Sequence, residues 1–211
     1  MINTGNLETN RTNNYTEIEM VVGEFNNNVI VDVNSEITDK EIKYVESIVR
    51  NSYEYKKYIK YLKENLDITR CSLLDGIDIK DLEVTLEFHH FPLSLFDLTT
   101  IIINKLIALK KEVSYFDIAE EIMKCHYENS VGLIPLTSTI HEMAHKKSIT
   151  IPYDKIYGNF MKFIYDNTQY LTDEIKERLE NNISASYSVS KEENDKKIKF
   201  SPLSYKIKYL T

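Results

Sequence analysis

Two stretches decide the fold of this chain: Thr85-Leu86-Glu87-Phe88-His89-His90 and Gly132-Leu133-Ile134-Pro135-Leu136-Thr137-Ser138-Thr139-Ile140-His141-Glu142-Met143-Ala144-His145. Together they hold four of the five histidines in 211 residues. The first alternates apolar and polar side chains, which is typical of a half-buried strand. In the second, His141 and His145 are four positions apart behind an apolar run, so on a helix they share one face. Three imidazoles that converge on one point can bind a divalent metal ion.

His89 and His90 are neighbours on the predicted strand. Their side chains therefore point to opposite faces as long as the strand stays regular, and both cannot bind the same metal. Either one binds while the other faces elsewhere, or the strand ends between them. Taken alone, the two histidines also fit half-buried polar residues at the end of a strand. The helical pair His141 and His145 favours the metal site.

The composition indicates one soluble globular domain. The chain is 42% hydrophobic and 28% charged, and 211 residues can bury a sizeable core. No apolar run approaches the ~18 residues of a membrane span, and the N-terminus lacks the pattern of a secretory signal. We therefore expect a cytoplasmic protein that does not enter a membrane. Cys71 and Cys125 have no second pair beside them, which favours reduced thiols over a disulfide framework or a zinc knuckle.

The charge argues against one class of partner. A net charge of −7 excludes a non-specific polyanion binder driven by global charge, although a local basic patch could still bind nucleic acid. The clear basic cluster is residues 196–209, where lysines alternate with aromatic side chains. This segment could bind substrate or pack as an ordinary terminal segment, and the sequence leaves both open.

Local patterns predict a mainly helical α+β chain with a single domain at residues 15–180. The predicted segments, in chain order, are a disordered tail (1–14), a hairpin (15–33), two helices (38–66, opened by a Thr38–Glu41 capping box), an irregular stretch (66–82), the first histidine strand, two helices (95–110 and 115–128, capped by Ser94 and Ser114), the second strand (132–136), the histidine helix, two further helices (about 154–165 and 173–180), and a linker with the basic C-terminal segment (181–211).

Residues 84–147 resemble an HNH endonuclease of the ββα-metal class. Glu87-Phe88-His89-His90 is similar to the first strand of that family, and the stretch from Gly132 to His141 is similar to its second strand and helix. The resemblance implies a mainly helical domain around a ββα-metal (HNH) motif, with a long helical insertion between the two strands.

The resemblance also implies a chemistry. His89, His141 and His145 would hold one divalent metal ion, and His90 would be the general base for hydrolysis of phosphodiester bonds in nucleic acid, DNA rather than RNA. Glu87 would hold a basic side chain near the scissile phosphate, and Arg70 is the candidate for that side chain. Mg, Mn, Zn and Ni are the candidate ions, and an all-histidine ligand set suits the transition metals best.

The chain departs from the family pattern in three ways. The two histidine stretches lie 51 positions apart (His90 to His141), farther than in minimal members, with two predicted helices between them. Gly132 stands where the family has an asparagine that braces the histidine loop, so that bond must come from elsewhere, and Asn129 is close in sequence. Thr137 and Ile140 stand where many relatives have cysteines, so we expect no structural zinc. None of these three departures removes a catalytic group.

Two other functions remain open. His141-Glu142-Met143-Ala144-His145 satisfies the H-E-x-x-H pattern of zinc proteases, in which Glu142 would be the base. A zinc protease would need a third ligand downstream, and it would leave His89 and His90 without a role. The other alternative is a catalytically inactive HNH scaffold that serves as a binding module. The fifth histidine, His126, is expected at or near the surface of its helix.

The origin of the protein is a further expectation. The chain is rich in Asn, Ile, Lys and Tyr, which suggests an AT-rich genome. Together with the type of protein, this favours a phage or a mobile element as the source.

Overall fold

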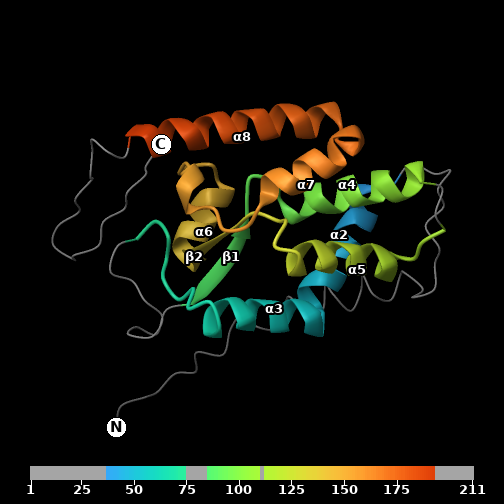
Figure 1. Cartoon of the computed structure of the whole chain (residues 1–211), viewed down its shortest axis with the longest axis horizontal. Coiled ribbons are helices and arrows are strands. Elements are labelled where there is room, and N and C mark those ends of the chain that lie inside the picture. Colours follow the sequence, from blue (N-terminus) through green and yellow to red (C-terminus); the bar gives the residue numbers. More distant parts are fainter. Residues whose placement is uncertain (1–36, 75–84, 110–111, 193–211) are drawn as a thin grey trace, which may run out of the picture.

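The computed structural model describes residues 37–74, 85–109 and 112–192. The predicted tail, the predicted hairpin at 15–33 and the basic segment at 196–209 lie outside the described residues. Within them the chain is mainly helical with a two-stranded antiparallel sheet, so the α+β class is confirmed (Figure 1). None of the described helices has the length and apolar character that crossing a membrane requires.

The elements follow the predicted order. They are α2 (Asp39–Asn51), α3 (Tyr53–Glu64), β1 (Leu86–His90), α4 (Leu95–Ala108), α5 (Tyr115–Tyr127), β2 (Leu133–Thr137), α6 (Ser138–His145), the short helix η1 (Tyr153–Lys155), α7 (Phe160–Asn167), η2 (Thr168–Tyr170) and α8 (Asp173–Glu192).

The helix starts predicted at Thr38, Ser94 and Ser114 are confirmed. In each case the hydroxyl accepts a hydrogen bond from the backbone N–H three residues on, and the acid at that position bonds back to the backbone N–H of the cap. These capping boxes satisfy backbone donors that the first helical turn leaves without partners. The signal is local, and so it could be read from sequence alone.

The hairpin of β1 and β2 separates two environments. Its register pairs His89 with Ile134 and His90 with Leu133. Since side chains alternate along a strand, Glu87 and His89 face α6, whereas Phe88 and His90 face the helices α3 and α5. The large core lies on the helical side, and a smaller cluster lies beneath α6, built from Cys71, Leu73, Leu86, Ile134, Leu136, Ile140, Ile149 and Ile151.

The glycine at position 132 is explained by a close approach of two backbones. A Cβ at Gly132 would lie 1.9 Å from the carbonyl oxygen of Phe91. The backbone N–H of Phe91 donates to the carbonyl oxygen of Gly132 at 3.0 Å, which ties the end of β1 to the start of β2. The two strand ends are therefore joined through the backbone, without a side chain at position 132.

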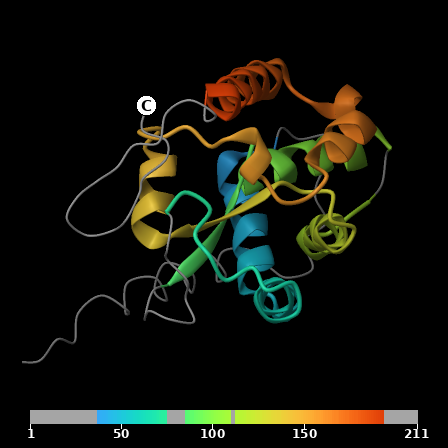
Figure 2. The ribbon, with the colours of Figure 1, turned by 60° about the vertical axis from the view of Figure 1, so that its left-hand side comes forward.

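The last helix is longer than the predicted helix at 173–180. Helix α8 continues to Glu192, so residues 181–192 are not a linker. Its second half packs on the rest of the molecule: Ser186 is fully buried and the Tyr187 ring stacks on Tyr153 with centroids 4.3 Å apart. Figures 1 and 2 show α8 running the length of the molecule, over both the helical half and the ββα unit. Helix α7 begins later than predicted, because η1 occupies the start of that stretch.

Candidate metal site

Three imidazoles converge where β1 meets α6. Nitrogen atoms of His89, His141 and His145, one from each ring, lie within 4.8 Å of one another. The Nε2 atoms of His141 and His145 are 3.1 Å apart. Two nitrogen ligands at 2.0–2.1 Å from a tetrahedral zinc ion would lie about 3.3 Å apart. The donor set therefore fits one divalent ion with little movement.

The short helix α6 sets the spacing of two of these ligands. Ile140 is buried against the hairpin, so the helix faces β1 along the side that carries His141 and His145. The helix ends in a Schellman motif directly after the second ligand. The N–H of Ser148 donates to the Met143 carbonyl and that of Lys147 to the Ala144 carbonyl, both at 3.0 Å. Lys147 consequently has a positive φ of 54°.

Glu87 orients one of the ligands. One carboxylate oxygen lies 2.6 Å from Nδ1 of His141, and the other accepts a hydrogen bond from the Ser138 hydroxyl at 2.6 Å. Because Nδ1 of His141 donates to the carboxylate, Nε2 of the same ring keeps its lone pair for a metal. A carboxylate behind a histidine also raises the basicity of the ligand. Alternation along β1 places Glu87 and His89 on one face, but the sequence pattern did not reveal this bond.

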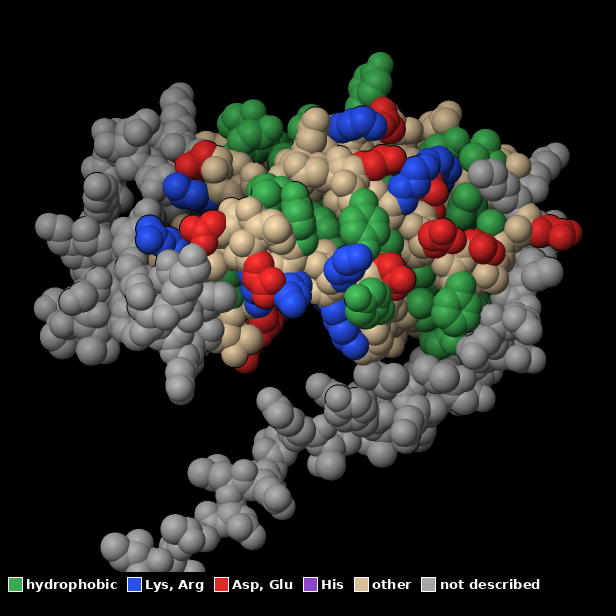
Figure 3. Space-filling view, turned by 60° about the horizontal axis from the view of Figure 1, so that its bottom comes forward, with side chains coloured by type: hydrophobic (Ala, Val, Ile, Leu, Met, Phe, Trp, Pro, Cys, Tyr) green, Lys and Arg blue, Asp and Glu red, His purple; other side chains and the backbone are tan. Residues whose placement is uncertain are grey.

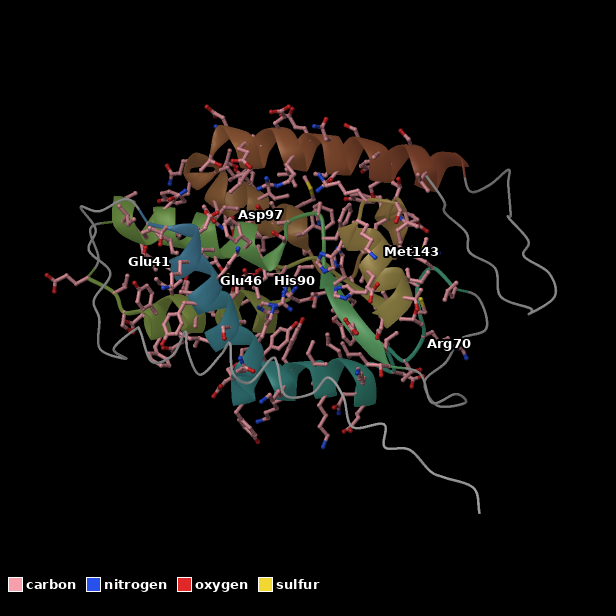
Figure 4. All side chains as sticks on the ribbon, turned by 180° about the vertical axis from the view of Figure 1, so that it is seen from behind. Glu41, Glu46, Arg70, His90, Asp97 and Met143 are labelled. Atoms are coloured by element: carbon pink, nitrogen blue, oxygen red, sulfur yellow. The ribbon has the colours of Figure 1, made fainter. Side chains whose placement is uncertain are left out.

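The structure gives Glu87 partners other than the expected Arg70, because His141 and Ser138 engage its two carboxylate oxygens. Arg70 is exposed, in a segment whose Ser72 N–H donates to the carbonyl of Pro135 at 2.9 Å. Figure 4 shows Arg70 at the periphery, beyond the start of β1, whereas His90 lies near the centre of the molecule. Arg70 is thus not part of the three-histidine site.

His90 lies on the other face of β1 and is only 5% exposed. Its Nε2 is 2.9 Å from Nε2 of His126, whose Nδ1 bonds to the carbonyl of Ile122 at 2.8 Å. A carbonyl only accepts, so Nδ1 of neutral His126 carries the proton and its Nε2 accepts from the N–H of His90. Tyr55 stacks on the His90 ring. His90 is thus buried and engaged by His126, although it also lines the cavity that His89 and His145 line. Its role as general base stays a prediction.

His126 is also not where it was expected. It is fully buried, rather than near the surface, and the rings of Tyr55 and Tyr58 meet it edge-on. The tyrosines of α3 divide accordingly: Tyr55 and Tyr58 are buried around the histidine pair, whereas Tyr53 and Tyr61 are exposed. The pair was missed because its members are distant in sequence and only the packing of α3 and α5 brings them together.

Two imidazoles of the three-histidine site, those of His89 and His145, have lowered pKa values. Burial lowers the pKa of His89 to about 3, and repulsion from His141 and His145 adds to the effect. The pKa of His145 is lowered in the same way, by burial and then by His141. Removal from solvent disfavours a charged ring, and each neighbouring imidazole opposes protonation of the next. At neutral pH the nitrogens of these two rings are therefore available to a metal.

We predict that Glu87→Gln weakens metal binding by about 10–100-fold, the usual effect of removing a partner behind a ligand. Glutamine can still accept a bond from His141, but it lacks the charge that raises the basicity of the ring. Calorimetric titration with Zn²⁺ and Mn²⁺ measures the change. Glu142→Gln is the matched control, because Glu142 is exposed on α6 and pairs with Lys146. Equal affinities for wild type and Glu87→Gln would contradict the assigned role.

Two cavities differ in their relation to the histidines. A groove of about 710 Å³ between α2 and α5 has five carboxylates and one lysine in its lining, and no histidine. A cavity of about 330 Å³ has His89 and His145 in its wall. An anionic substrate would be repelled by the first, so the second is the functional candidate. Figure 3 shows acidic and basic side chains intermingled on one face, without a continuous basic surface for a duplex.

Comparison with protein families gives one finding. A family model described as Bacteriophage G278-like virion protein matches residues 1–209, nearly the whole chain. No HNH nuclease family matches, so the resemblance to that class rests on the residues of the ββα unit. No curated protein and no solved structure matches the chain.

Proposed function

The chain belongs to the family of bacteriophage G278-like virion proteins, and we propose that it is a metal-dependent nuclease of the phage particle. This membership confirms the predicted phage origin. The observation that carries the proposal is the convergence of His89 with His141 and His145 on a strand–strand–helix unit. That arrangement supports hydrolysis of a phosphodiester bond in nucleic acid. The place of action is then the virion rather than the cytoplasm alone.

The roles of the residues follow from the geometry. His89, His141 and His145 would hold the ion, and Glu87 and Ser138 would fix the ring of His141. A bound divalent ion would supply a Lewis acid for the phosphate and would lower the pKa of a coordinated water towards about 7. Because all three ligands are neutral, they leave the charge of the ion undiminished, whereas carboxylates would partly cancel it. His90, which lines the same cavity as His89 and His145, would be the general base once its bond to His126 is released.

The protease alternative has less support. The His141 and His145 pair fits the H-E-x-x-H pattern, but the third imidazole, His89, comes from an upstream strand. The Glu142 side chain is 71% exposed and lies 3.5 Å from the ammonium group of Lys146. A zinc protease base must face the open position of the metal, next to the substrate.

A second candidate is a structural metal site in a virion protein without enzymatic activity. It is favoured by the burial of His90 and by its bond to His126, which engage the ring that would otherwise serve as the base. Such a protein would gain stability from the ion and would cleave nothing.

The test is incubation of plasmid, single-stranded circular DNA and RNA with the full chain and Mg²⁺, Mn²⁺, Ni²⁺ or Zn²⁺. We expect cleavage that a chelator stops. Thermal stabilisation by the same ions without any cleavage would favour the structural site. His89→Ala, purified in parallel, controls for contaminating nucleases.

We predict that Glu142→Ala leaves both metal affinity and cleavage at the wild-type level, because its carboxylate is exposed and weakly paired. In a zinc protease the same change would remove the base and lower turnover by about 10²–10⁴-fold. The measurement is DNA cleavage beside hydrolysis of a casein substrate. Casein hydrolysis that disappears in Glu142→Ala would establish the protease instead.

A further inference from the structure

The cavity of about 330 Å³ beside the three-histidine site is built from separate parts of the chain. His89 and His145 form the wall shared with the metal site. The segment after α6 supplies Lys147 and Ile149, and Phe91 follows the end of β1. Helix α8 closes the far side with Asn182 and Ala185, so the cavity exists only because α8 is long.

The lining combines an apolar wall with one available cation. Phe91, Ile149 and Ile151 make the wall apolar. Arg178 also lines the cavity, but its guanidinium is paired with the buried Asp97 and with Glu174. Lys147, by contrast, has no ion pair among the described residues. An anion that enters from the metal site would therefore meet the ammonium group of Lys147.

Lys147 occupies a backbone position that favours glycine. Its φ of 54° is left-handed, as the end of α6 requires. Glycine adopts this conformation without steric cost, whereas lysine does not. The chain thus carries a cation at the rim of the cavity in place of the residue that would best stabilise the turn.

We propose that this cavity is a nucleotide subsite that takes one unpaired nucleotide next to the scissile phosphate. The base would lie against Phe91 and the isoleucines, with the phosphate between Lys147 and the three histidines. Apolar and aromatic walls bind any base by its face. A cavity at the small end of the ligand-binding range admits one nucleotide, and a paired base would first have to leave its stack. The inference rests on the proposed nuclease function and specifies its substrate as single-stranded nucleic acid.

The experiment uses thymidine 5′-monophosphate as the probe, titrated into the Mn²⁺-loaded full chain. Lys147→Gly is expected to weaken its binding by about 10–100-fold, the contribution of a charge-assisted hydrogen bond. The same variant should unfold at an equal or higher temperature, because glycine suits the turn. A merely structural lysine would not give these opposite changes. Lys147→Arg should restore most of the affinity.

A second variant fills the cavity without touching the metal site. Ala185→Leu places a larger side chain in the cavity from the surface of α8, and it should weaken nucleotide binding and slow cleavage of single-stranded DNA. Asn181→Leu is the matched control, because Asn181 is exposed on the same helix and does not line the cavity. Metal affinity should be unchanged in both variants.

The outcomes separate the subsite from the nuclease. The subsite is refuted if the nucleotide does not bind the wild-type protein. It is also refuted if Lys147→Gly and Ala185→Leu bind the nucleotide with the wild-type affinity, even where DNA is cleaved. If binding depends on both residues but no metal supports cleavage, the subsite stands and the nuclease proposal fails. Duplex DNA cut as fast as single-stranded DNA would overturn the substrate assignment.

Discussion

His141→Ala is expected to abolish both metal binding and nucleic-acid cleavage. The substitution removes one of three ligands and leaves the carboxylate of Glu87 without the ring that it orients. Two imidazoles hold a divalent ion poorly. We expect the affinity to fall by more than the roughly 10–100-fold that follows loss of a partner behind a ligand. Calorimetric titration and plasmid cleavage measure the two losses side by side.

The thermal stability of the same variant, measured with and without the metal ion, gives an independent test of metal binding. An ion at about 1,000 times its Kd stabilises a folded protein by about 4 kcal/mol. Wild type should show such a gain, and His141→Ala should show none. Lys146→Ala, an exposed neighbour on α6, should behave as wild type. A His141→Ala variant that still gains stability from the metal would mean that the ion binds elsewhere.

Much of the ligand set could be predicted, because each part of the signal is local. Strand alternation placed His89 on one face, and helical spacing placed His141 and His145 together. The resemblance to the ββα-metal class then suggested that strand and helix meet, and the structure brings the three rings together. The capping boxes at Thr38, Ser94 and Ser114 were equally local.

The remainder depends on contacts between distant segments. The bond between His90 and His126 joins β1 to α5. No local sequence pattern in either element indicates this partner. The same holds for α8, whose second half is rich in Ser and polar residues and resembles a linker in sequence. Its helical form is stabilised by the packing of Ile183 and Val189 against the two cores and by the stacking of Tyr187 on Tyr153.

The buried pair also has a consequence for acid stability. Burial lowers the pKa of His126 to about 4, and a bond to the Ile122 carbonyl only partly offsets this. Its ordinary value in an unfolded chain is about 6.5. The pKa of His90 is likewise lowered, by burial and by His126. As the pH falls below about 6.5, the unfolded state therefore binds protons that the folded state excludes, and the free energy of unfolding decreases.

The stability contributed by His126 is fully present above pH 6.5 and is lost as the pH falls through about 4. One such group changes the free energy of unfolding by about 1.4 kcal/mol per pH unit, or about 3 kcal/mol over the window. Urea unfolding of the full chain at several pH values, with a chelator present so that metal release does not contribute, measures the slope.

His126→Gln isolates this contribution. Glutamine can accept the bond from His90 but does not titrate, so the slope between pH 6.5 and 4 should decrease by roughly one proton. At pH 8 the variant should be less stable than wild type by about 1–2 kcal/mol, because the bond to Ile122 and the packing against Tyr55 and Tyr58 are lost. His145→Gln is the control: its ring is largely exposed, so its loss should alter the slope less. An unchanged slope in His126→Gln would mean that the buried pair takes up protons without unfolding, and that the acid sensitivity of the chain comes from other groups.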